Sequence, residues 1–139
     1  MMKVTVAYGM TERVDLSHER AVAVVTEALR NEGFGVLTTI DVRKTMWEKL
    51  GEEMPDYVIL GACNPTLAYM ALRDEIDVGL LLPCNVVVRT DPEDEKTVVS
   101  IQNPMIMSEL TGSHQIEKVA GLAREKLERV LAEVKGVAP

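Results

Sequence analysis

Tyr57-Val-Ile-Leu-Gly-Ala-Cys63-Asn64-Pro65 is typical of a buried strand that is followed at once by the start of a helix. The strand residues are nearly all apolar, which indicates a strand covered on both faces. Asn64 is a favoured N-cap, because its side chain accepts a hydrogen bond from the first helical turn, and Pro65 suits the first helical position. The helix is expected to end near Arg73. This stretch therefore predicts a strand–helix unit in the middle of the chain.

A second apolar stretch follows, Gly79-Leu-Leu-Leu-Pro-Cys84-Asn85-Val-Val-Val-Arg89. After a turn at 74–79, it predicts a strand over residues 84–90. Residues 97–103 alternate between apolar and polar side chains, and the acidic turn 91–96 joins the two strands. An antiparallel hairpin is therefore expected here. We interpret residues 105–107, which follow Pro104, as a separate extended apolar run and residues 110–115 as a loop.

The first part of the chain predicts another strand–helix–strand unit. Residues 3–9 alternate and predict the first strand. The helix that follows is expected to begin after the N-cap Ser17 and to end at Gly33. Residues 34–40 predict the second strand, which places two strands before the central stretch.

Two further helices are marked by their ends. Asp41 is expected to cap a short helix that stops before Gly51, and Ser113 to cap a long amphipathic helix over residues 114–135. Five strands and two major helices predict an α+β fold, a two-layer sandwich in which a mainly antiparallel five-stranded sheet carries the helices on one face. We expect one domain over residues 1–139. The other sheet face must be solvated or covered by a second subunit, which favours a homodimer.

The composition excludes several classes of protein. The 139 residues carry a net charge of −7, which argues against nucleic acid and against an anionic membrane surface as partners. No signal peptide and no membrane-spanning stretch is expected, so we predict a cytoplasmic protein with both of its thiols free. Aromatic residues are only 4% of the chain, so the core must be aliphatic.

Three motifs strongly resemble the prokaryotic family known as Domain of Unknown Function 302 (DUF302): Gly33-Phe-Gly-Val-Leu-Thr-Thr-Ile-Asp41, Ile59-Leu-Gly-Ala-Cys-Asn-Pro65 and Gly79-Leu-Leu-Leu-Pro-Cys-Asn-Val-Val-Val88. The resemblance covers roughly residues 33–90. It implies a small two-layer α+β fold similar to that of the TATA-binding protein, and it implies no established reaction. Some members lack cysteine at the positions that match Cys63 and Cys84. The resemblance thus implies that a function shared by the whole family does not depend on these thiols.

The two cysteines are nevertheless the candidate site. Cys63 ends a strand just before the helix capped by Asn64, where unpaired N–H groups and the helix dipole can lower the pKa of a thiol. If the two central strands are neighbours, Cys84 approaches Cys63. The pair can then hold a soft metal ion, form a reversible disulfide or flank a small ligand. Asn85 and Arg89 are further candidate ligand-binding residues, Arg89 because it is the one basic residue in the central strands.

Each candidate also has a purely structural interpretation. Cysteine is often a small buried hydrophobe, and Cys84 alternates with valines on an apolar face. The pair lacks the Cys-x-x-Cys spacing of redox and zinc motifs. Met105 and Met107 can line a soft-metal or haem pocket, although methionine is usually a gap-filler. His18 and His114 are expected to be surface or capping residues, and no catalytic motif is present.

Three hypotheses of function follow. The first is a non-enzymatic binding protein, a homodimer that holds a small ligand, a metal ion or haem near Cys63, Asn64 and Cys84. The second is a thiol-based redox enzyme or sensor, in which Cys63 attacks as a thiolate and Cys84 resolves. The third is a structural or interaction module. The sequence identifies neither a cofactor nor a ligand for any of them.

Overall fold

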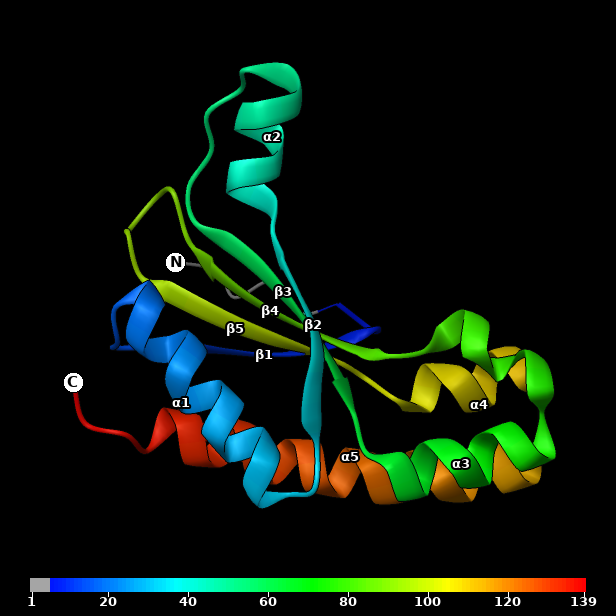
Figure 1. Ribbon diagram of the computed structural model, residues 1–139. Coiled ribbons are helices and arrows are strands. Elements are labelled where there is room, and N and C mark those ends of the chain that lie inside the picture. Colours follow the sequence, from blue (N-terminus) through cyan, green and yellow to red (C-terminus); the bar gives the residue numbers. More distant parts are fainter. Residues whose placement is uncertain (1–5) are drawn as a thin grey trace.

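The computed structural model describes residues 6–139, and its centre is a five-stranded antiparallel sheet (Figure 1). Along the chain the strands are β1 (Gly9–Val14), β2 (Gly35–Asp41), β3 (Tyr57–Cys63), β4 (Cys84–Thr90) and β5 (Thr97–Gln102). Across the sheet their order is β1-β5-β4-β3-β2, and every neighbouring pair is antiparallel. The predicted hairpin is therefore confirmed, and the two cysteine-bearing strands β3 and β4 are neighbours.

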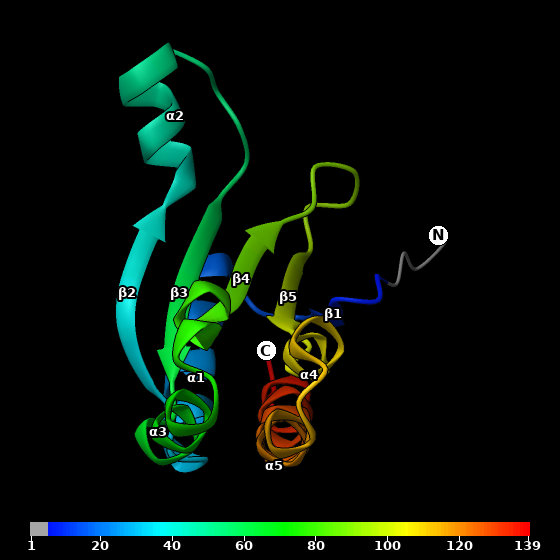
Figure 2. The same ribbon diagram turned by 90° about the vertical axis from the view of Figure 1, so that its right-hand side faces the viewer.

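The helices confirm the α+β class. They are α1 (His18–Asn31), α2 (Val42–Leu50), α3 (Pro65–Asp74), α4 (Met105–Thr111) and α5 (His114–Lys135), with a 3₁₀ helix η1 (Ile76–Leu81). The two longest, α1 and α5, pack on each other and against one face of the sheet (Figures 1 and 2). The buried core between these layers is aliphatic, apart from Phe34. Within residues 6–139, no helix combines the length and the apolarity that crossing a bilayer requires.

The four predicted N-caps are all formed. The side chains of Ser17, Asp41, Asn64 and Ser113 each accept a hydrogen bond from the backbone N–H three residues further on, at 3.0–3.2 Å. Each of these bonds satisfies one of the N–H groups that a helix start leaves without a partner. Because a cap joins residues three positions apart, it depends on local sequence and was predictable.

The first strand lies later than the sequence predicts. Of the predicted strand 3–9, residues 3–5 lie outside the described residues, and residues 6–8 are not in a strand. β1 instead begins at Gly9 and pairs with β5. This strand contains Glu12 and Arg13, and these charged residues hide the apolar–polar alternation by which the other strands were predicted. Both charges are satisfied by distant partners: Glu12 by Lys135 of α5 at 2.7 Å, and Arg13 by two aspartates of the β4–β5 turn.

Residues 105–111 form the helix α4, not the predicted extended run and loop. Pro104 stands directly before the helix, where its missing N–H costs nothing. The Asn103 side chain accepts a hydrogen bond from the N–H of Met105 at 3.1 Å, and Gly112 ends the helix with a left-handed backbone. The expected turn at 74–79 is likewise partly helical, because η1 occupies residues 76–81.

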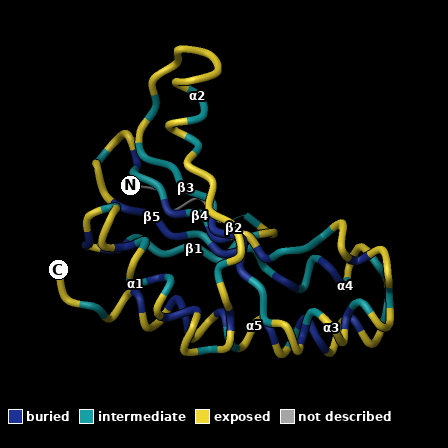
Figure 3. Tube along the Cα trace, viewed as in Figure 1, coloured by how far each residue is buried: buried dark blue, intermediate teal, exposed yellow. Residues whose placement is uncertain are grey.

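The short helix α2 projects away from the rest of the protein. Figures 1 and 3 show it beyond the end of the sheet, where no other helix covers it. None of its nine residues is buried, and Trp47 and Leu50 remain 58% and 67% exposed. A helix this short is marginal in water without packing partners. Its apolar side chains therefore lack the burial that stabilises α1, α3 and α5.

Candidate functional site

Cys63 and Cys84 line one small cavity at the end of the sheet. The antiparallel register places Ala62 of β3 opposite Cys84 of β4, so Cys63 lies at the strand end beside it. The cavity has a free volume of about 30 Å³ and an almost wholly apolar lining. Besides the two cysteines, the lining consists of Phe34, Ala62, Asn64, Leu67, Ala68, Ala71, Leu82, Pro83, Met107, Val119 and Ala123. This volume is enough for a water molecule or a single ion and far below that of a typical ligand pocket.

The Asn64 side chain is held in place by its contacts with the backbone. Its side-chain oxygen accepts the hydrogen bond from the N–H of Leu67 that caps α3, at 3.2 Å. Its side-chain nitrogen lies against Gly33, where an added Cβ would stand 3.1 Å from it. Gly33 has a φ of +84°, which only glycine adopts readily. Asn64 therefore connects the start of α3 to the turn that follows α1, which is a structural task.

The thiols are not activated by their surroundings. Burial raises the pKa of Cys63. Burial, and to a smaller extent the charge of Cys63, raises the pKa of Cys84 to about 11. The sequence-based expectation of a lowered pKa for Cys63 is thus not met. Desolvation of the partly exposed Cys63 thiol disfavours its thiolate form and is the cause of the raised pKa.

We expect both thiols to react slowly with iodoacetamide at neutral pH. Only the thiolate attacks, and a raised pKa lowers its fraction at pH 7. Alkylation of Cys63 should accelerate at a pH above that of an ordinary thiol, and alkylation of Cys84 only near pH 11. Mass spectrometry of the native protein across pH, with Cys84→Ala to assign the sites, measures this. A Cys63 midpoint at or below about 8.5, the ordinary value, would contradict it.

The larger hollow lies on the open face of the sheet, opposite α1 and α5. It has a volume of about 500 Å³, within the range of small-ligand sites. Along β4, Asn85, Val87 and Arg89 face this side, while Cys84, Val86 and Val88 are buried under the helices. The groove is lined by Val6, Tyr8, Gly9, Thr11, Tyr57, Asn85, Val87, Arg89, Ser100, Ile101 and Gln102. We call these residues the open-face groove.

Hydrogen bonds order the floor of the open-face groove. The hydroxyls of Thr11 and Ser100 bond each other across β1 and β5 at 2.9 Å. The Gln102 side chain accepts a hydrogen bond from the N–H of Asn85 at 3.3 Å. Arg89 stands opposite Tyr57 of the neighbouring strand. The polar groups of four strands thus converge on one surface.

The β4–β5 turn is fastened beside Arg89 by a charge cluster. Arg13 donates to Asp91 at 2.6 Å and to Asp94 at 2.9 Å. The backbone N–H of Glu93 and the Arg13 guanidinium hold the pKa of Asp91 below its usual range. These ion pairs attach the acidic turn to β1, so its aspartates have a structural role and are not merely solvated. Among residues 6–139, no group of three or more His, Cys, Asp or Glu side chains is arranged to hold a metal ion.

The sheet separates the five residues that the sequence groups together. Cys63, Asn64 and Cys84 line the apolar cavity, whereas Asn85 and Arg89 line the open-face groove. Neighbouring residues of one strand point to opposite faces, so Cys84 and Asn85 cannot share a site.

Of the polar residues that line the open-face groove, the sequence pattern identified Asn85 and Arg89 but not Tyr8, Thr11, Tyr57, Ser100 and Gln102. The alternation in residues 84–89 was the available signal on β4. The residues that β1 supplies to the groove could not be predicted, because the charged side chains of β1 obscured the strand pattern. Met107, which the sequence suggested for a soft-metal pocket, does lie beside the cysteines. His18, expected at the surface or in a cap, bonds the backbone oxygen of Val88 at 2.9 Å, and His114 is exposed.

Comparison with known proteins agrees with this architecture. The chain is similar to a solved structure described as the crystal structure of an uncharacterized conserved protein DUF302 from Bacillus stearothermophilus. The two share 26% sequence identity and a TM-score of 0.85, over 92% of this chain and 98% of that one. No curated protein matches the chain. The family described as "Domain of unknown function DUF302" matches residues 10–134. That range extends well beyond the motifs at residues 33–90, and the protein therefore belongs to the DUF302 family.

Proposed function

We propose that this protein is a non-enzymatic binding protein whose open-face groove holds a small organic anion, such as a carboxylate or a phosphate ester. One observation carries the proposal: Arg89 is the single cation among the described residues that line the groove, and no carboxylate lines it. A groove whose lining carries a net positive charge is unusual in a chain of net charge −7. An arginine guanidinium is also well suited to paired hydrogen bonds with a carboxylate or phosphate.

The surroundings of Arg89 support this role. Its side chain makes no ion pair or hydrogen bond with any of residues 6–139. The nearby charge of Asp91 acts on it only through space, because Arg13 already binds that carboxylate. Tyr57 and Tyr8 supply aromatic surface and hydroxyls, and Asn85 supplies an amide. Such a lining suits an anionic head group attached to a flat or apolar body.

The test is ligand-induced thermal stabilisation with a panel of aliphatic and aromatic carboxylates and inorganic phosphate. A ligand that binds only the folded state raises the midpoint of unfolding, and the increase grows with the logarithm of its concentration relative to its Kd. We expect at least one aromatic carboxylate to do so, Arg89→Gln to abolish the effect, and Arg20→Gln to preserve it. Arg20 is a matched control because it is exposed on α1, outside the groove. Equal stabilisation of wild type and Arg89→Gln would reject the proposal, and so would a panel without effect.

A second candidate function rests on a separate observation: three sulfur-bearing residues, Cys63, Cys84 and Met107, line the same cavity. Thiolate and thioether ligands favour monovalent copper, and the cavity is large enough for one ion. Binding would release a proton from each thiol, so affinity should rise with pH. The raised pKa values give no support to the thiol-based redox hypothesis.

Competition with a colorimetric copper(I) chelator tests the metal site. We expect Cys84→Ala to abolish binding and Met107→Leu to weaken it. Met105→Leu, on the same helix but outside the cavity lining, should leave it unchanged. Copper retained equally by Cys84→Ala and wild type would exclude this site.

A further inference from the structure

β2 is an edge strand without the usual protection. It ends the sheet opposite β1, and six of its seven residues are exposed. An edge strand presents unpaired N–H and C=O groups, which natural proteins guard with lysine, proline or inward-pointing charges. β1 carries Glu12 and Arg13, both in ion pairs, but β2 has no charge before Asp41 and no proline. Such an edge is suited to pairing with another strand.

One irregularity of β2 increases its apolar exposure. The pairing with β3 shifts between Val36 and Thr38, which makes Leu37 the extra residue of a bulge. Leu37 is 68% exposed, and Ile40 further along the strand is 47% exposed. A bulge can itself deter pairing. Here it lies near the start of the strand, and the rest of the edge, from Thr38 to Asp41, is regular.

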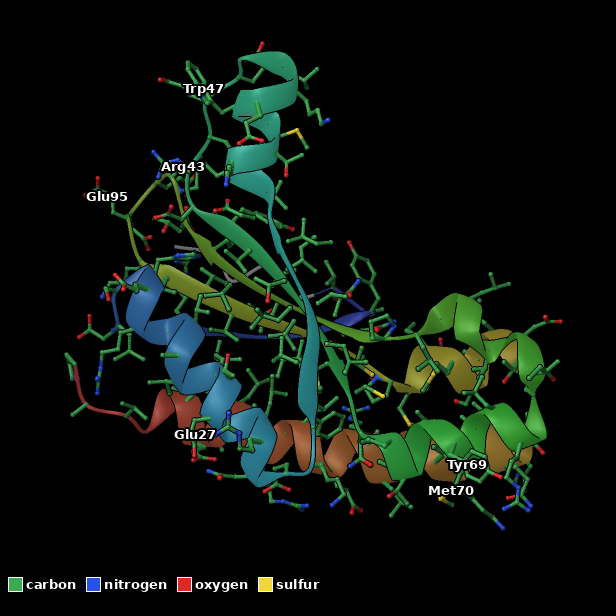
Figure 4. The ribbon with its side chains drawn as sticks, in the orientation of Figure 1. Glu27, Arg43, Trp47, Tyr69, Met70 and Glu95 are labelled. Carbon is green, nitrogen blue, oxygen red and sulfur yellow. The ribbon has the colours of Figure 1, made fainter. Side chains whose placement is uncertain are left out.

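Two apolar surfaces lie at opposite ends of this strand. At its C-terminal end, α2 exposes Trp47 and Leu50. At its other end, Gly35 pairs with Cys63, and α3 begins two residues later. α3 exposes Tyr69 by 64% and Met70 by 42%. Figure 4 shows Trp47 on the projecting helix and Tyr69 and Met70 far from it, at the other end of the molecule.

A two-fold axis through β2 brings these surfaces together. If the β2 strands of two copies pair antiparallel, the C-terminal end of one strand lies beside the N-terminal end of the other. The α2 of each copy is then placed where the α3 of the other begins. The two Asp41 carboxylates lie at opposite ends of the paired strands and do not face each other. A single symmetric contact therefore covers the edge and both apolar surfaces.

Charge favours this arrangement. α2 contains Arg43, Lys44 and Lys49 against one acidic residue, Glu48, so its net charge is positive. The segment from α3 through η1 contains one arginine against three acids, so its net charge is negative. Arg43 is paired with Asp56 at 2.9 Å and Lys44 lies 3.9 Å from Glu48, which leaves Lys49 as the cation of α2 without an ion pair among residues 6–139. The two-fold pairing brings α2 close to the negative segment of the other copy.

We propose that β2, α2 and the exposed side of α3 form the interface of a homodimer, with the two β2 strands paired antiparallel. The strand has seven residues and α2 has nine, which approaches the roughly 20–30 residues that each side of a standard interface contributes once α3 is added. The interface leaves the open face of the sheet accessible. The second subunit expected from the sequence thus covers the edge of the sheet rather than its face, independently of any ligand in the groove.

Analytical ultracentrifugation of wild type and three lysine variants tests the interface. Leu37→Lys places a charge on the β2 edge, and Leu50→Lys places one on α2. Leu110→Lys is the matched control, because Leu110 is 67% exposed on α4, away from the interface. We expect wild type and Leu110→Lys to sediment as dimers, and the other two variants to dimerise at least about a hundredfold more weakly. Circular dichroism verifies that each variant is folded.

The single tryptophan, Trp47, supplies a second measurement. It is 58% exposed in the isolated chain, so burial against the α3 of a second copy should shift its fluorescence to the blue. Dilution of wild type should return the emission to the red as the dimer dissociates. A wild type that is monomeric at all concentrations would overturn the proposal. Folded Leu37→Lys and Leu50→Lys dimers of wild-type affinity, or emission that is constant through dissociation, would also overturn it.

Discussion

Leu127→Ala is expected to lower the free energy of unfolding by about 2–5 kcal/mol. Leu127 is fully buried in α5, the helix that packs against α1, α3, α4 and β1. Truncation to alanine removes apolar burial and leaves a cavity that the surrounding aliphatic side chains fill only in part. Urea unfolding followed by circular dichroism, at one fixed protein concentration, measures the loss.

Leu122→Ala is the control for this prediction. Leu122 lies on the same helix and loses the same atoms, but it is 46% exposed. The two variants share the change in helix propensity, so the difference between them reports burial alone. We expect Leu122→Ala to cost less than about 1 kcal/mol. Equal losses in the two variants would mean that α5 does not pack on the sheet as described.

Gly61→Ala is expected to destabilise the protein by about 1–3 kcal/mol, even though the change is only one added methyl group. Gly61 lies in β3 on the open face of the sheet, between Thr38 and the cis-bonded Pro83. A Cβ there would overlap the Thr38 hydroxyl and stand 3.0 Å from the ring of Pro83. Its backbone does not require glycine, so the loss comes from steric overlap. The same urea titration measures it.

Two comparisons isolate that overlap. Gly35→Ala adds the same methyl group to a neighbouring strand, where nothing lies within 4 Å of the new Cβ, and should be nearly neutral. Combining Gly61→Ala with Thr38→Ala removes the overlapping hydroxyl and should recover part of the loss. Additive effects in the double variant would show that Thr38 is not the obstacle.

The predictions that held depend on short-range physics. Each N-cap is a hydrogen bond across three residues, so Ser17, Asp41, Asn64 and Ser113 marked their helices without reference to the rest of the chain. The hairpin of β4 and β5 is likewise local, because a short turn joins strands with apolar alternation. The predictions for β1, α4 and the turn at 74–79 were wrong, and at β1 the charged residues that interrupt the apolar pattern are paired with partners distant in the chain.

The candidate site was predictable only in part. The neighbouring strands brought Cys63 and Cys84 to one cavity, as the sequence analysis expected. Burial, however, raised the pKa of Cys63, which proximity to a helix start was expected to lower. Desolvation depends on every segment that packs over a thiol. Those segments include α4 and α5, which lie far along the chain from both cysteines.

By itself, the sequence determined the α+β class, the helix starts, the central hairpin and the family, because these depend on local hydrogen bonds, apolar alternation and short motifs. Tertiary structure alone decided that Glu12 and Arg13 belong to a strand, since their partners Lys135 and Asp91 are distant in the chain. Tertiary structure also decided that Cys84 lies on the helix-covered face of the sheet and Asn85 on its open face. Which face becomes core depends on where α1 and α5 dock, and docking is a property of the whole fold.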